Sequence, residues 1–257
     1  MAKFTDASNT AISALNLVVG PKHVRFDEGQ KATSITVKSS DSSVKVVGTV
    51  VFDGPEGIHT VKLSAAKAGS AIITGTTRSG QSATLSITVG PRIELPPRNT
   101  TAGLVARLLL AEVMSPSGTK YNLTDATTCM ERMVLVLNNR LKNPGQFGAT
   151  GATTVDEIIK APGQFAGFDH FPNHYAPLIP RIQGVVDNAN NNNLPSQSDF
   201  QNHLNEAIRI ANAHATPITD PSSTELIGWR TSGHGSPGPS FVAFSVQLLG
   251  TQFFQRK

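Results

Sequence analysis

The acidic side chain of Glu112 stands at the end of a long apolar run, in the segment GLVARLLLAEVMSPSG (residues 103–118). If this segment is a helix, Glu112 shares its apolar face with Leu108 and Leu109, because residues three and four apart project in similar directions. Burial on that face and a position in the last helical turn both disfavour the charged form of a carboxyl group. A carboxyl group that stays protonated near neutral pH can serve as a general acid, which predicts acid/base chemistry at Glu112.

A structural role for Glu112 stays open beside the chemical one. A buried glutamate can be held in an ion pair, and Arg132 and Arg140 of the next apolar segment are the candidate partners. Asp125 precedes that segment and could act as a second carboxylate, which would suit hydrolysis by water. Its place just before an apolar helix suits a helix cap better. From the residues alone, neither interpretation of Glu112 prevails.

The residues after the first hundred predict a mainly helical domain that positions Glu112. Apolar residues recur there with helical spacing and follow capping residues. The helices expected from this pattern cover residues 101–114, 126–142, 154–160 and 198–215. The tail SFVAFSVQLLGTQFFQRK alternates like two strands that meet near Gly250, and the tract NANNNN (residues 188–193) is expected to be an exposed loop.

Residues 14–90 carry a different pattern, with a period near two. Val, Ile and Thr alternate with other residues in five short runs, and turns rich in Gly, Ser and Asp separate these runs. The prolines of GPRIELPPRNTT exclude a helix and mark the joint between two domains. The sequence therefore predicts an all-β sandwich over residues 1–95, followed by the mainly α domain with a small β element over residues 96–257.

The segment LSAAKAGSAIITGTTRSGQSATLSITV resembles the bacterial Ig-like domain, group 2. The positions that match the family's pattern of small, glycine and strand residues are Ala65, Lys67, Gly69, Ala71, Ile73, Gly80, Ile87 and Val89. The resemblance implies an Ig-like sandwich that serves as an adhesion or spacer module and has no site of its own.

Three motifs of the second half together resemble the cell-wall hydrolases of the spore-cortex-lytic SleB type. In chain order they are LVARLLLAEVMSPSG, MVLVLNNRLKNPGQF and VDEIIKAPGQFAGF, and the tail GTQFFQRK is similar to the family's closing strand. The matching residues are Ala111, Glu112, Leu137, Asn139, Arg140, Lys142, Ile159, Gln164 and Phe165. One departure is Pro116, which stands where the family usually has a second acid.

This resemblance implies a lysozyme-like fold and cleavage of peptidoglycan between N-acetylmuramic acid and N-acetylglucosamine. Glu112 would protonate the leaving oxygen and then, as a carboxylate, take the proton of the muramyl C6 hydroxyl while a 1,6-anhydro ring closes. Gln164 would hydrogen-bond a sugar or N-acetyl group, and Phe165 would contact the glycan, shape the cleft or pack in the core. The other candidate substrate-binding residues are Asn139, Tyr121 and Trp229. The single tryptophan is expected in a Gly-rich loop, where it suits a sugar platform or a core anchor equally well.

Composition argues against several other classes of protein. The net charge of +4 comes from residues 1–98, where 11 basic residues face 7 acidic ones without a dense patch. This disfavours nucleic-acid binding and suits a mild attraction to an anionic envelope. No apolar run is long enough to span a bilayer. Pro172 breaks the helix that a zinc site at His170 and His174 would need, so neither a metal nor a cofactor is expected. Cys129 is expected to be a buried thiol.

These features predict a peptidoglycan glycosidase, either a lytic transglycosylase or a muramidase, that acts on glycan strands in the periplasm or cell wall. The N-terminus is a poor signal peptide, so a phage-borne or non-classically exported protein is expected. A phage tail, a secretion apparatus or an immunity protein are then the candidate partners. The alternative, from another class, is a non-catalytic envelope-binding or phage structural protein that keeps the fold.

Overall fold

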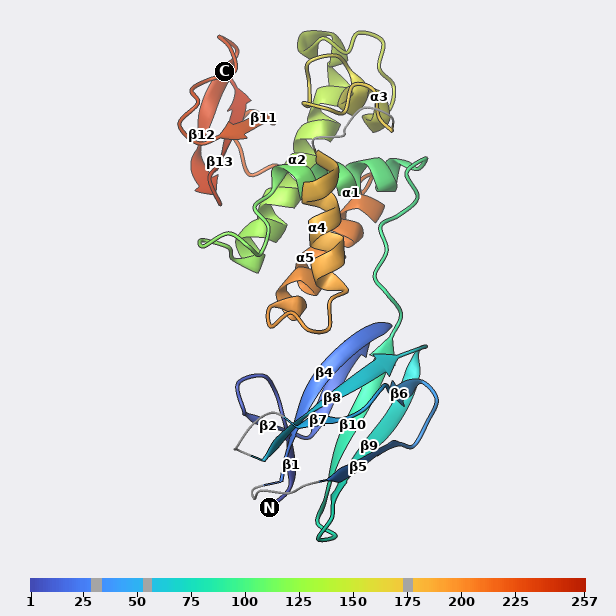
Figure 1. The fold of residues 1–257 in the computed structure, drawn as a ribbon. Helices are drawn as coiled ribbons and strands as arrows, with labels where there is room; N and C mark the ends of the chain where they lie inside the picture. The colour runs from blue at the N-terminus through green and yellow to red at the C-terminus, as the bar shows by residue number, and fades with distance from the viewer. Residues whose placement is uncertain (29–33, 53–56, 173–177) are drawn as a thin grey trace. The chain divides into compact units, whose positions relative to one another are not determined.

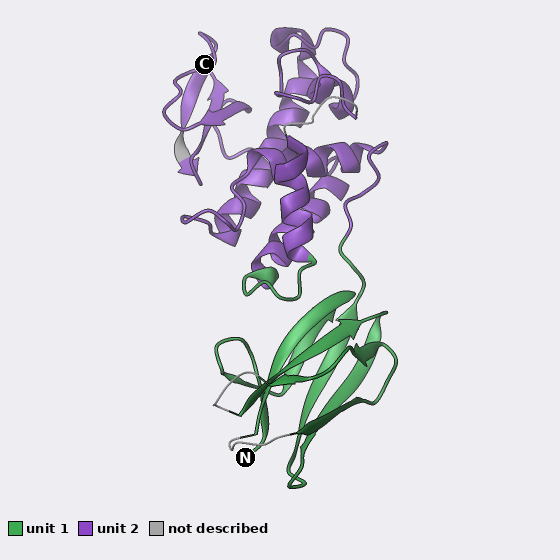
Figure 2. Ribbon diagram, in the orientation of Figure 1, with its two compact units in different colours: residues 1–93, 190–197 green, residues 94–189, 198–257 purple. Residues whose placement is uncertain are grey.

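The computed structural model describes residues 1–28, 34–52, 57–172 and 178–257 (Figure 1). The chain divides into two compact units (Figure 2). Unit 1 comprises Met1–Ile93 and Asn190–Gln197, and unit 2 comprises Glu94–Ala189 and Ser198–Lys257. Unit 1 is built from strands, whereas unit 2 combines helices with strands. Among the described residues, no helix has both the length and the apolar composition needed to cross a bilayer.

Two sheets form unit 1. The first has the strand order β2-β1-β4-β8-β6, with β7 also paired to β8, and the second has the order β3-β10-β9-β5. The strands β3 and β10 run parallel, and the other described pairs are antiparallel. The strands are β1 (Lys3–Thr5), β2 (Ala11–Ile12), β3 (Ala14–Val18), β4 (Gly20–Asp27), β5 (Ile35–Ser39), β6 (Val44–Val46), β7 (Val51–Phe52), β8 (Ile58–Ala65), β9 (Gly69–Thr77) and β10 (Ser82–Gly90).

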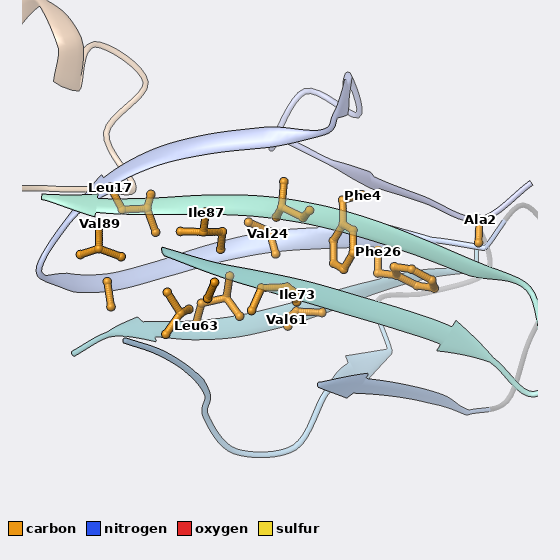
Figure 3. Close-up of a cluster of buried hydrophobic side chains, with 14 residues drawn as sticks. Ala2, Phe4, Leu17, Val24, Phe26, Val61, Leu63, Ile73, Ile87 and Val89 are labelled. Atoms are coloured by element: carbon orange, nitrogen blue, oxygen red, sulfur yellow. The ribbon is translucent and has the colours of Figure 1, made fainter. Parts of the chain in front are cut away.

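An apolar core lies between these two sheets. Side chains in β9 and β10 alternate between buried and more exposed positions, so Ile73 and Ile87 point inward, as the period of two predicts. Phe4 and Phe26 of the first sheet meet edge to face, with ring centroids 5.1 Å apart (Figure 3). Gly75 of β9 lies directly against the Phe26 ring, and a Cβ there would clash with it. The close packing of the two sheets therefore requires glycine at this position.

The asparagine tract is not the exposed loop that its composition predicts. Asn192 is buried, accepts a hydrogen bond from the Val18 N–H at 2.9 Å and donates one to the Val18 carbonyl at 2.8 Å. Asn190 is also buried and pairs in the same way with Ile93, at 2.9 Å for both bonds. An asparagine side chain carries one carbonyl and one N–H₂ group, so it can pair with a peptide group as a neighbouring strand would. The tract thus completes unit 1.

Unit 2 contains five α-helices and a three-stranded sheet of order β11-β13-β12 in its described residues. The helices are α1 (Thr101–Glu112), α2 (Leu123–Lys142), α3 (Val155–Lys160), α4 (Ile179–Ala189) and α5 (Gln197–Asn212), with a 3₁₀ helix at Pro144–Phe147. The strands are β11 (Leu226–Thr231), β12 (Phe241–Leu248) and β13 (Thr251–Arg256). The long helix α2 packs against β11, so the sheet covers one side of the helical part.

The prediction of a mainly α, lysozyme-like second domain is wrong. Over the described residues, strands outnumber helices. The two strands predicted in the tail are present as β12 and β13, and β11 joins them in a three-stranded sheet. The Gly-rich segment around Trp229 had the composition of a loop, yet it forms β11. It is a strand because it pairs with β13, more than 20 residues away, and such non-local pairing leaves little trace in local composition. The helix α4 was also not predicted.

Helix starts in unit 2 follow from capping side chains. Thr100 caps α1, because its hydroxyl accepts a hydrogen bond from the Gly103 N–H at 3.0 Å. Thr154 begins α3 in a reciprocal capping box with Glu157. Gly103 also lets α1 approach the preceding proline segment, because a Cβ there would clash with the Pro97 carbonyl oxygen. This close approach sets where α1 begins. The length of α1 then sets where Glu112 lies, because Glu112 is the last residue of the helix.

Candidate functional site

Glu112 is the last residue of α1. The nine residues before it, Gly103 to Ala111, are all buried, whereas Glu112 itself is half-buried. Its carboxylate accepts a hydrogen bond at Oε2 from the indole Nε1–H of Trp229 on β11, at 3.2 Å. The helix therefore delivers one carboxyl group from the core to an accessible position beside the sheet. Neither residue type nor spacing indicated that Trp229 would be its partner.

No positively charged partner holds Glu112 within the described part of the chain. No lysine, arginine or histidine nitrogen described there lies within the 4.0 Å of an ion pair from its carboxylate. Of the two predicted partners, Arg132 lies over the rings of Phe244 and Phe253, at 5.3 and 5.8 Å from their centroids. Arg140 instead donates hydrogen bonds to the Ile227 carbonyl and to Gln164. The ion-pair alternative for Glu112 is therefore wrong in the described structure.

Trp229 is held in place by a stack with Phe165. The two ring centroids are 5.0 Å apart and the rings are inclined by 28°. Phe165 is only 6% exposed, so it packs in the core and does not offer a face to a glycan. Trp229 is half-buried. The stack and the hydrogen bond to Glu112 together fix the indole, which makes Trp229 a positioning residue for the carboxylate.

Arg140 contacts the Phe165 ring of this stack and forms hydrogen bonds with two neighbouring segments. Its Nε–H donates to the Ile227 carbonyl of β11 at 2.8 Å, and its Nη1 donates to Gln164 Oε1 at 2.7 Å. Its guanidinium lies over the rings of Phe165 and Phe147, at 5.4 and 5.1 Å. Burial lowers the pKa of Arg140 to about 10, and no described carboxylate forms an ion pair with it. A single buried cation thus links α2, β11 and the segment after α3.

Gln164 and Asn139, the two amide side chains predicted to bind substrate, differ in whether they keep a hydrogen-bonding group free for a ligand. Gln164 is half-buried, and its Nε2–H₂ group donates to no described acceptor, so it can donate to a ligand. Asn139 is 2% exposed. It donates to Asp220 Oδ2 and to the Leu226 carbonyl and accepts from Lys142 Nζ, at 2.8, 2.9 and 2.9 Å. Asn139 therefore stabilises the fold and has no amide atom to spare for substrate.

Asp125 lies in the first turn of α2 and is not its cap. Asn122 caps the helix, because its side-chain oxygen accepts from the Asp125 N–H at 3.0 Å. The pKa of Cys129 is raised to about 11, mainly by burial, with smaller contributions from the negative charges of Glu112 and Asp125. The thiol is buried, as predicted.

The side chain of Tyr121 contacts His203 of α5. Its hydroxyl lies 3.3 Å from Nδ1 of His203, and the rings meet edge to face. Burial, followed by the charge of Asp199, raises the pKa of Tyr121 to about 12. His203 is fully buried, and burial and the charge of Arg181 lower its pKa to about 4. His203 was not predicted, although a histidine between Phe200 and Leu204 on an apolar helix face was a signal for it.

The pH dependence of stability is expected to follow His203. An unfolded histidine gains its proton near pH 6.5, whereas His203 in the folded chain does so only near pH 4. The neutral ring is therefore favoured by folding, and this stabilisation is complete above about pH 7 and is lost as the pH falls from about 6.5 toward 4. We expect the free energy of unfolding in urea to fall by about 2 kcal/mol between about pH 7.5 and about pH 5 through this group.

The variant His203→Phe isolates this effect, because it keeps a ring against Tyr121 and cannot take up a proton. The expected result is a shallower decrease of stability with falling pH, whatever the variant costs at neutral pH. Equal pH dependence in both proteins would show that His203 does not carry the linkage.

Other candidate centres do not assemble in the described structure. No group of three or more His, Cys, Asp or Glu side chains within the described residues could hold a metal ion, and His174 lies outside them. Pro116 lies in the segment between α1 and α2, and nothing in the structure explains a proline at that position.

Comparisons with known proteins do not assign a family. Neither a protein-family model nor a curated protein matches this chain. Domains 4 and 5 of the S-layer protein SbsC are similar over 30% of this chain and 47% of that chain, with 15% identity and a TM-score of 0.26. CopC from Methylosinus trichosporium OB3b is similar over 37% of this chain and 100% of that one, with 21% identity and a TM-score of 0.26. A polysaccharide lyase is similar over 82% of this chain and 33% of that one, with 10% identity and a TM-score of 0.24. This chain thus spans about half of the SbsC fragment, and likenesses this weak carry no argument about its function.

Proposed function

We propose that this protein cleaves peptidoglycan glycan strands between N-acetylmuramic acid and N-acetylglucosamine, with Glu112 as the acid and base. The observation that carries the proposal is the placement of its carboxyl group and the contacts that it makes. Glu112 is accessible at the end of a buried helix, accepts one hydrogen bond from a neutral indole, and has no cation in ion-pair range among the described residues. A carboxyl group in this position can reach a bound substrate, whereas one held in an ion pair with an arginine is already occupied.

The reaction needs two proton transfers by the same residue. Protonated Glu112 donates its proton to the glycosidic oxygen as the bond to the muramyl C1 breaks. The resulting carboxylate then takes the proton of the muramyl C6 hydroxyl while that oxygen bonds to C1, so a 1,6-anhydro ring closes and Glu112 is again protonated. The indole N–H of Trp229 stabilises the carboxylate between the two steps. The free amide of Gln164 is available to donate to an N-acetyl carbonyl or sugar hydroxyl.

The order of motifs along the chain supports the same proposal. The matches to the SleB-type hydrolases include Glu112, Arg140, Gln164 and Phe165, and their side chains form one series of contacts through Trp229. Asp125 leaves a second route open, because a carboxylate that activates water would give hydrolysis in place of ring closure. The proposed place of action is the periplasm or cell wall, reached by a phage tail or a secretion apparatus, with an immunity protein as a further candidate partner.

Mass spectrometry of digested peptidoglycan tests the proposal. We expect the wild-type protein to release muropeptides with 1,6-anhydro ends and the Glu112→Gln variant to release none. Reducing ends would point to hydrolysis, and an Asp125→Asn variant would then be expected to lose them. If folded wild-type protein releases neither product from purified peptidoglycan, the glycosidase proposal fails and the non-catalytic envelope-binding or phage structural role stands in its place.

A further inference from the structure

Unit 2 contains a cavity of about 520 Å³ at the end of its sheet. It is lined on one side by Phe147 and Phe241, whose rings meet edge to face at 6.3 Å. Arg256 and Lys257 line it on the side of strand β13. Its volume falls within the range of about 300–1,000 Å³ that is common for ligand sites. The cavity thus offers apolar walls and two cations.

This cavity adjoins the surroundings of Glu112 through Arg140. Phe147 lies under the Arg140 guanidinium, and the Ile227 carbonyl, which accepts from Arg140, belongs to another lining residue. Arg140 also lies over Phe165, which stacks on Trp229. A short series of side-chain contacts within unit 2 therefore connects the cavity lining to Trp229, the partner of Glu112.

The charges around the cavity favour an anion. Glu225 is shared by two cations, with Lys142 at 3.0 Å and Arg256 at 3.3 Å. Arg256 is further held by Gln146 Oε1 at 2.7 Å, so its guanidinium has a fixed position. The Lys257 ammonium forms no ion pair with a described carboxylate, while its backbone N–H donates to the Ser240 carbonyl at 3.0 Å. Arg256, held by Glu225 and Gln146, and the Lys257 side chain thus place two cations in the lining of the cavity.

We propose that this cavity binds a carboxylate of the peptide stem attached to the glycan. The proposal rests on the proposed function, because it names which part of peptidoglycan is recognised beside the cleaved bond. The stem is a short peptide that carries free carboxylates and small apolar side chains. Lys257 attracts the carboxylate, Arg256 orients it with its remaining N–H groups, and the two phenylalanine rings contact the apolar part.

Binding measurements on the Glu112→Gln protein test this inference without cleavage of the probe. The probes are a glycan tetrasaccharide without peptide, the same glycan with L-Ala-D-Glu stems, and that glycan with its stem carboxylates amidated. By calorimetry, we expect the acidic stem to bind about three- to tenfold more tightly than the amidated stem. Adding Lys257→Gln is expected to remove this difference, whereas the matched surface change Lys120→Gln is expected to preserve it.

The outcomes separate this inference from the proposed function. Equal affinity for acidic and amidated stems, or a preference that survives Lys257→Gln, would overturn the stem-binding site. Cleavage of the peptide-free glycan by the wild type is scored independently and bears only on Glu112. If that glycan is cleaved without any stem preference, the cavity proposal alone fails. If the stem preference is found but no glycan of any kind is cleaved, the cavity proposal stands and the glycosidase fails.

Discussion

Replacing Glu112 by glutamine is expected to lower the rate of glycan cleavage by about 10²- to 10⁴-fold, the usual contribution of a general acid and base. Glutamine has the same shape, and its carbonyl oxygen can still accept the indole N–H of Trp229, so the site geometry is retained. It can neither protonate the leaving oxygen nor take the C6 hydroxyl proton. The measurement is the initial rate of soluble muropeptide release at equal concentrations of folded protein.

A matched control is Glu131→Gln on the neighbouring helix α2. Glu131 is partly exposed and its carboxylate pairs with Arg209 at 3.1 Å, so its loss tests for general effects of removing a negative charge. This control is expected to retain the wild-type rate. A Trp229→Phe variant keeps a ring on Phe165 but removes the N–H donor, and we expect it to lower the rate less than Glu112→Gln does. A Glu112→Gln protein that is fully active would refute the assigned role.

Arg140→Ala is expected to lower the free energy of unfolding by about 3–5 kcal/mol. The change leaves the buried Ile227 carbonyl and Gln164 Oε1 without their donor, at about 1–3 kcal/mol for each unpaired group. It also removes the guanidinium from the rings of Phe147 and Phe165 and opens space in a packed region. Urea denaturation followed by circular dichroism measures the change.

The control for this prediction is Arg209→Ala. Arg209 is about half exposed and pairs with carboxylates at the surface, so its removal is expected to cost about 1 kcal/mol or less. Arg140→Lys keeps the charge but cannot reproduce the planar contacts, and it is expected to fall between the wild type and Arg140→Ala. A cost at Arg140 as small as that at Arg209 would contradict the role of Arg140 in joining α2 to β11.

Much of the local structure was predictable from the sequence because its causes are local. The period of two in residues 14–90 predicted strands with alternating burial, and Ile73 and Ile87 are buried as that period requires. Thr100 and the apolar run after it predicted a helix that ends close to Glu112. Local composition misled where the partner lies far away, as in the segment of Trp229, which pairs with the chain terminus, and the asparagine tract, which pairs with Val18 and Ile93.

The candidate site divides in the same way. By itself, the sequence determined that a carboxyl group would stand at the end of an apolar helix, because helical spacing places residues on a face without reference to the rest of the fold. Only the tertiary structure decided that this group accepts a hydrogen bond from Trp229 and pairs with no described arginine. It also decided that Arg140 donates to Gln164 and to β11, and that the Asn139 side chain forms its hydrogen bonds within the fold. Those choices depend on which segments pack together, and that packing is set by contacts between residues far apart in the chain.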